Sequence, residues 1–299
     1  MTDIRKCRIF VFALLLLLAA ASQSWAGINL AYPAKVGLGE PFLVRVTSDK
    51  DMQSVSVNWK GSAVKPEVRE WKGRFVALAM LGTDVLTDKT GKSKLVVSVN
   101  EGGKERSFSR TVRVNKKKYK VQRLTLPEKM VTPPAEVMDR IARDRKEIVA
   151  AKGTVSAERH WYVPFQRPTK GSQSSPYGAR RILNGKPKNP HRGLDFRGGK
   201  GTAVKAMSDG RVVLVGNHYY AGNSIYIDHG NGVVTMYFHL SRIDVKEGDI
   251  VERGQVIGGI GSTGRATGPH LHMSVSVLGR LVDPAYLLYR TTDQLLGIQ

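Results

Sequence analysis

The strongest constraint on the fold is a strict alternation of polar and apolar side chains over residues 270–277. The even positions are His, His, Ser and Ser, and the odd positions are Leu, Met, Val and Val. Successive side chains of a strand point to opposite faces, so this pattern predicts a strand with one face in the core. His270 and His272 then share the polar face, roughly 7 Å apart.

A second stretch, 233–240, places another histidine on a predicted strand. Its even positions are all apolar, which predicts that they face the core, whereas His239 falls among the odd positions. We therefore expect His239 to point away from the apolar side. Two strands that present histidines opposite their apolar faces indicate the floor of a polar cleft. The even positions are Val234, Met236, Phe238 and Leu240.

The distribution of glycine marks out one β-domain. Nineteen of the 31 glycines lie within 171–268, which predicts many tight turns there. No long helical period interrupts the strand-like runs of this region. The fold class is therefore mainly β, with an antiparallel β-domain over 154–299. The clearest runs are 211–215, 224–227, 233–240 and 270–277.

Residues 27–122 predict a second β-domain, because short strand-like runs alternate with turns. Glu101-Gly102-Gly103 lies between the last two runs and is typical of a hairpin. Short strands at this spacing predict a small immunoglobulin-like β-sandwich. No catalytic constellation is visible in it, so it is either a targeting or regulatory module or a spacer. The runs are 42–46, 54–59, 74–78, 95–99 and 107–112.

Residues 123–153 predict a linker with one helix. Pro133-Pro134 precedes a helical pattern that continues to about Ala151. Val137, Ile141 and Ile148 fall on one stripe of this helix. We expect the helix to pack between the two domains; a helix lying on a membrane surface is the alternative.

Residues 1–26 have the features of a secretory signal peptide. Basic residues are followed by an apolar run over 9–21 and by Ser24-Trp25-Ala26, a typical cleavage site. The run is shorter than the ~20 residues that span a bilayer. We therefore expect cleavage and export to the periplasm or cell envelope, with no membrane span left; an uncleaved anchor is the alternative. The single cysteine, Cys7, would leave with the signal, which excludes thiolate ligands and disulfides from the mature chain.

The chain carries a large excess of positive charge. It has 47 Lys and Arg against 25 Asp and Glu, and without residues 1–26 the counts are 44 and 24, a net charge of +20. Such an excess favours polyanionic partners. For an exported protein these are cell-wall polymers, anionic lipids or lipopolysaccharide. Nucleic acid is not expected as a partner, because no motif with base-stacking aromatics accompanies the charge.

Four histidines and one aspartate suffice for a zinc site. They are His191, Asp195, His239, His270 and His272. Catalytic zinc takes three protein ligands and a water molecule. Two imidazoles and one carboxylate leave the site with a net charge of +1, which lowers the pKa of the bound water to about 7. The two remaining imidazoles could accept a proton or stabilise an oxyanion.

Several short blocks between 172 and 290 occur in a specific order. With these blocks the stretch resembles the lysostaphin-type zinc metallopeptidases, which cut peptide cross-links in bacterial peptidoglycan. The N-terminal half is loosely similar to the non-catalytic domains that precede such peptidases in exported Gram-negative proteins. The blocks are Ser175–Arg181, His191–Phe196, Gly201–Val204, Asp209–Val212, His229–Gly232, Tyr237–Leu240, Val245–Asp249, Gly254–Gly258, Gly261–Gly264, Gly268–His272 and Asp283-Pro284.

The resemblance implies that His191, Asp195 and His272 ligate Zn²⁺ and that His239 and His270 are catalytic. It implies a metalloendopeptidase that hydrolyses peptidoglycan through a zinc-activated water. The expected bond is D-Ala–diaminopimelate, and a glycine bridge is the alternative. The complete set of five side chains argues against a non-catalytic wall-binding protein or an activator of another wall hydrolase. We expect a monomer.

Three further residues are candidates for substrate binding at the cleft wall. Tyr177 and Arg180 precede the first expected ligand, and His218 is followed by two tyrosines. His229, at a hairpin turn, is expected to be structural. We also expect the N-terminal half or the linker to cover part of the cleft, because two domains joined by a short helix will touch.

Overall fold

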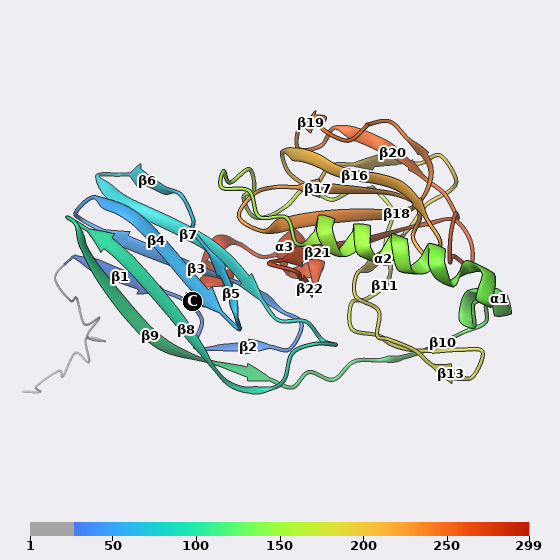
Figure 1. Cartoon of the computed structure of the whole chain (residues 1–299), viewed down its shortest axis with the longest axis horizontal. Coiled ribbons are helices and arrows are strands. Elements are labelled where there is room, and N and C mark those ends of the chain that lie inside the picture. The colour runs from blue at the N-terminus through green and yellow to red at the C-terminus, as the bar shows by residue number, and fades with distance from the viewer. Residues whose placement is uncertain (1–26, 299) are drawn as a thin grey trace, which may run out of the picture.

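A computed structural model describes residues 27–298, so the predicted signal peptide lies outside the described residues. Within this range the protein is mainly β, as predicted, and has two β-rich halves that lie side by side (Figure 1). Among the described helices, none combines the length and the apolar composition needed to cross a bilayer.

Two sheets make up the N-terminal half and enclose a shared apolar core. Fully buried Trp59 packs edge-on against Phe42 between them, with ring centroids 5.2 Å apart. All strand pairs are antiparallel except β2–β9. The five predicted runs lie in strands, and the immunoglobulin-like topology stays a prediction. One sheet has the order β1 (Ile28–Ala31), β3 (Pro41–Ser48), β7 (Arg74–Gly82), β6 (Val68–Trp71); the other has the order β2 (Lys35–Gly37), β9 (Lys104–Asn115), β8 (Gly91–Glu101), β4 (Met52–Trp59), β5 (Ser62–Val64).

A ten-stranded sheet dominates the C-terminal half, and all of its strand pairs are antiparallel, as expected. Its main path is β11 (Gln173–Ser175), β14 (Leu194–Arg197), β21 (His270–Val277), β18 (Val233–Ile243), β17 (Gly222–Asp228), β16 (Gly210–His218), β19 (Ile250–Val251). Three strands branch from this path: β15 (Ala203–Lys205), β20 (Val256–Ile260) and β22 (Arg280–Val282).

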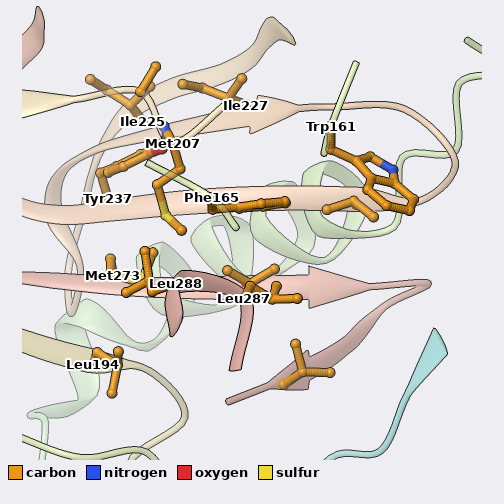
Figure 2. Close-up of a cluster of buried hydrophobic side chains, with 14 of the residues drawn as sticks. Trp161, Phe165, Leu194, Met207, Ile225, Ile227, Tyr237, Met273, Leu287 and Leu288 are labelled. Carbon is orange, nitrogen blue, oxygen red and sulfur yellow. Dashed lines mark hydrogen bonds between the residues drawn. The ribbon is translucent and has the colours of Figure 1, made fainter. Parts of the chain in front are cut away.

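The odd-numbered residues of β21 face the main core, as the alternation predicts. Figure 2 shows this core, in which Met273 lies near the side chains of α3 (Pro284–Tyr289). The hydroxyl of buried Tyr237 accepts a hydrogen bond from the Met207 N–H at 2.9 Å. Leu43 and Met80 of the N-terminal half belong to the same cluster, so the two halves share one core. A last helix, α4 (Thr292–Leu296), adds Leu295 and Leu296.

Helix α2 (Met138–Lys152) covers the opposite face of the C-terminal sheet (Figure 1). Ile148 and Ala151 pack there against buried Tyr226 and Met236. The expectation that this helix packs between the halves is therefore wrong: its apolar stripe covers a sheet face that would otherwise be exposed. Two short helical turns precede it, α1 (Glu128–Val131) and η1 (Ala135–Val137).

The linker also adds a strand to the C-terminal half. β10 (Val121–Leu124) pairs in parallel with β12 (Arg180–Leu183), and β12 pairs with β13 (Lys186–Pro187). Leu126 and Val131 pack on Leu183 behind this small sheet. β12 precedes the expected ligand loop. It is held in place by β10, which lies some sixty residues earlier in the sequence.

A partly buried ion pair joins the two halves near the expected ligand loop. Asp84 of the N-terminal half accepts hydrogen bonds from Arg192 Nη1 at 3.2 Å and from the Leu281 N–H at 3.1 Å. The Arg192 carbonyl accepts a hydrogen bond from Ser274 Oγ at 2.9 Å. One residue of the loop thus contacts both the sandwich and strand β21.

Candidate metal centre

Three polar side chains converge at the end of the β14–β21 strand pair. His191 lies in the loop before β14, while Asp195 and His272 are cross-strand partners. Asp195 Oδ1 is 2.9 Å from His191 Nε2 and 2.8 Å from His272 Nδ1, and the two ring nitrogens are 2.9 Å apart. These are the three side chains whose ligand atoms could hold one metal ion.

The hydrogen bonds on the far sides of the two rings account for the one N–H group that each neutral imidazole carries. His191 Nδ1 donates to the Pro176 carbonyl at 2.9 Å. The Ser274 hydroxyl donates to a carbonyl, so it accepts from His272 Nε2 at 2.9 Å. Burial lowers the pKa of His272 to about 4, which keeps the ring neutral at pH 7, with a single N–H. In neutral rings that make these bonds, the nitrogens that face Asp195 present lone pairs.

Three acceptors that face one another without a donor repel, and a cation between them removes the repulsion. Imidazole nitrogen and carboxylate oxygen are ligands that zinc takes, at about 2.0–2.2 Å. Neighbouring donors in such a tetrahedron are about 3.3 Å apart, slightly wider than the observed triangle. The residues present therefore fit zinc. The carbonyl and hydroxyl partners of the rings are the groups that orient ligand histidines in such sites.

His239 and His270 lie beside this triangle and line the same pocket. Their ring centroids are 4.8 Å apart, and the His239 ring centroid is 6.1 Å from that of His272. Each Nδ1 donates to a carbonyl at 2.8 Å, Thr263 for His239 and Gly268 for His270. Burial, together with the nearby histidines, lowers the pKa of His239 to about 3. The neutral His239 ring therefore presents Nε2 as a proton acceptor.

The route by which His239 reaches the pocket differs from the prediction. The odd residues Val233 and Tyr237 face the main core, and the even residue Phe238 lies on the other face, stacked on His272 with centroids 5.2 Å apart. Regular alternation would direct His239 into the core. Instead the strand pairing shifts at this point, and His239 adopts a left-handed backbone with φ of 63°. This strained conformation turns the ring into the pocket.

Gly193, between His191 and Asp195, has no space for a side chain. A Cβ there would lie 2.6 Å from Ser274 Oγ and 2.7 Å from His272 Cε1. We expect Gly193→Ala to displace His272 and to lower both metal content and hydrolytic activity, the latter by about a hundredfold. Metal analysis of the purified variant and an activity assay measure this. Gly199→Ala is the matched control, because a Cβ at Gly199 meets no atom within 4 Å; equal losses in both variants would contradict the argument.

The pocket has a volume of about 290 Å³ and extends from Asp195, His239, His270 and His272 to the start of the linker. Gln122 and, from the predicted linker, Leu124 and Leu126 line it, so the start of the linker forms part of the pocket wall, in agreement with the expectation that it covers part of the cleft. The complete lining is Gln122, Leu124, Leu126, Ser174, Ser175, Arg181, Leu183, Asp195, Arg197, His239, Arg265, Ala266, Thr267, Gly268, Pro269, His270 and His272.

The structure places the three predicted substrate residues outside this pocket. Tyr177 is buried between the two halves, where its hydroxyl donates to the Leu281 carbonyl at 2.6 Å. His218 is buried under α2, 3.4 Å from Glu147 and 2.7 Å from Ser224 Oγ. Arg180 points to solvent on β12, so the alternation of that strand brings its neighbour Arg181 to the pocket instead. At these positions, none of the three side chains can contact a substrate bound in the pocket.

Three pocket arginines were missed. Arg181 Nη2 contacts Asp195 Oδ2 at 3.1 Å, and Arg197 and Arg265 line the same pocket. The position of Arg197 could have been inferred from the sequence, because it lies two residues after Asp195 and therefore on the same face of a strand. Arg265 lies in a loop, and no local pattern identifies it.

These observations define a class of protein: it is mainly β and has a His–Asp–His cluster beside an open pocket. The model of peptidase family M23 matches residues 189–284. A crystal structure from Pseudomonas aeruginosa described as a peptidase M23 is 30% identical, with a TM-score of 0.63; the match covers 87% of this chain and 96% of that one. The chain belongs to peptidase family M23.

Two curated relatives match the C-terminal half. Peptidoglycan DD-endopeptidase ShyA of Vibrio cholerae is 54% identical over 94 residues, which are 31% of this chain and 22% of ShyA. DD-carboxypeptidase/endopeptidase Mpg of Neisseria meningitidis is 41% identical over 120 residues, which are 40% of this chain and 28% of Mpg. The similarity thus spans about a quarter of the length of these relatives.

Proposed function

We propose that this chain is a zinc metalloendopeptidase that hydrolyses the peptide cross-links of bacterial peptidoglycan. The observation that carries the proposal is the convergence of ligand atoms from His191, Asp195 and His272 within 4.8 Å of one another, beside two further imidazoles that line an open pocket. Family membership and the peptidoglycan endopeptidases among the relatives support it. The expected bond is D-Ala–diaminopimelate, in line with the names of the DD-endopeptidase relatives.

Zinc held by these three side chains supplies a Lewis acid that polarises the scissile carbonyl and lowers the pKa of a water molecule to about 7. The chain's own contribution is to receive and return the proton. His239 presents Nε2, since its Nδ1 donates to the Thr263 carbonyl, so it can accept the proton of the attacking water. His270, with Nδ1 fixed on the Gly268 carbonyl, is held at the same pocket to stabilise the developing oxyanion or to protonate the leaving amine.

Export fits this substrate, because peptidoglycan lies outside the cytoplasmic membrane. The basic, apolar and small-residue segments within 1–26 support a secretory signal. The excess of 47 basic over 25 acidic residues favours association with anionic polymers of the envelope.

The test is to incubate purified residues 27–299 with isolated peptidoglycan, with and without a chelator, and to identify released fragments by mass spectrometry. We expect soluble fragments whose masses correspond to cleavage between D-Ala and diaminopimelate, and no release after chelation until zinc is restored. Binding to peptidoglycan that is insensitive to the chelator and releases no fragment would instead indicate a wall-binding protein or an activator.

A further inference from the structure

Positive charge surrounds the pocket. Arg181, Arg197 and Arg265 all line it, and Asp195 is its single acidic lining residue. Arg181 pairs with Asp195 at 3.1 Å. Within residues 27–298, no carboxylate lies within 4.0 Å of the guanidinium of Arg197 or Arg265. Two permanent positive charges therefore face the pocket without an acidic partner from the described chain.

Arg265 is held in place although it forms no ion pair. Its backbone N–H donates to the Tyr220 carbonyl at 2.9 Å, and its guanidinium lies 4.4 Å from the centroid of the Tyr220 ring. Burial lowers the pKa of Arg265, and the nearby charge of Arg181 acts in the same direction. A partly buried guanidinium next to another one is costly unless an anion joins them.

Arg197 is placed by the same strand pair as the metal cluster. In the β14–β21 register Asp195 is opposite His272, and Arg197 is opposite His270. Because side chains two residues apart share a face, these four groups form a square on one side of the sheet. Arg197 therefore lies two residues after the expected ligand Asp195, on the same face of β14, and opposite His270.

Arg181 completes the cationic lining and has spare donor capacity. Its Nη2 contacts Asp195, whereas its buried Nε has no hydrogen-bond partner among the described residues. The pocket also has an apolar part from Leu124, Leu126 and Leu183. Its lining thus combines unpaired guanidinium groups with a surface that accepts methyl or methylene groups.

We propose that Arg197 and Arg265 bind a free carboxylate next to the scissile bond, so that the enzyme selects cross-links that carry one. This inference rests on the proposed function. In a D-Ala–diaminopimelate cross-link the carbon that bears the scissile amide nitrogen also bears a carboxylate, whereas a glycine bridge has none inside its chain. Arginine binds carboxylates through two parallel hydrogen bonds. The pocket charge therefore favours the direct cross-link over the glycine bridge.

The test compares two dimeric stem peptides that differ only in the diaminopimelate carboxylate next to the scissile bond, which is free in one and amidated in the other. We expect kcat/KM to be about 10- to 100-fold higher for the free carboxylate, as for hydrogen bonds to a charged group. Arg265→Gln and Arg197→Gln should each reduce this preference while zinc content is unchanged. Arg242→Gln, an exposed arginine outside the pocket that pairs with Asp244, should keep it.

Equal rates of the unaltered protein on both peptides, or an undiminished preference in both pocket variants, would overturn the inference and leave the proposed function intact. Cleavage of neither peptide, nor of isolated peptidoglycan, would remove the proposed function and the inference with it. The comparison of substrates on the unaltered protein does not depend on how well either variant folds.

Discussion

Replacing His272 with alanine is expected to remove the bound zinc and to lower peptidoglycan hydrolysis at least about a thousandfold. The reason is that His272 Nδ1 lies 2.8 Å from Asp195 Oδ1 and 2.9 Å from His191 Nε2, so the substitution leaves the cluster with two of its three ligand atoms. A catalytic metal contributes several kcal/mol to transition-state stabilisation, and each 1.4 kcal/mol is a factor of ten in rate. Metal analysis and the release of soluble fragments measure the two effects.

Two other histidine substitutions serve as controls for the loss of zinc and of activity. His160→Ala should change neither quantity, because this half-exposed ring contacts Glu158 at 3.6 Å and does not line the pocket. His239→Ala should keep the zinc and still lose most of the activity, since His239 offers a proton acceptor but is not one of the three ligands. Full zinc occupancy in His272→Ala would contradict the assignment of the ligands.

The isolated C-terminal segment 154–299 is expected to be less stable than residues 27–299, by at least about 3 kcal/mol in the free energy of unfolding of this half. Truncation removes fully buried Leu43 and Met80 from the shared core, at about 1.5–3 kcal/mol each. It also removes β10, the parallel partner of β12, and α2, which covers buried Tyr226 and Met236. Urea unfolding, followed by the fluorescence of Trp161, which both chains contain, measures the difference.

A fragment that begins at residue 121 separates the contribution of the sandwich from that of residues 121–153, which include β10 and α2. It keeps β10 on β12, and it keeps the cluster of Leu126, Val131 and Leu183, but it lacks the sandwich. Its unfolding midpoint should therefore lie between those of the other two chains. If all three midpoints coincide, the halves are independent and the shared cluster does not contribute to stability.

Patterns that are local in sequence predicted the structure well. The alternation in 270–277 placed the histidines on one face of β21 and Met273 in the core, because period two is a property of a single strand. The helix was likewise found within a few residues of α2. The three side chains that the resemblance implied as ligands, His191, Asp195 and His272, also lie together.

The failures concern properties that depend on distant segments. His239 reaches the pocket through a shift in strand pairing and a left-handed backbone, and neither is encoded by alternation. The face that Arg180 presents depends on the register of β12 with β10. Tyr177 and His218 appeared functional because they are polar aromatics near motifs, yet each is buried by an element whose position no local pattern reveals.

Arg192 has a consequence for how this protein could have diverged. Its guanidinium pairs with Asp84 of the sandwich, while its carbonyl receives the hydroxyl of Ser274, which in turn orients His272. A different domain grafted in front of the C-terminal half would leave this cation without its acid, one position away from His191, an expected metal ligand. Exchange of the leading domain should therefore require a matching change at position 192, so that the two halves are inherited as a pair.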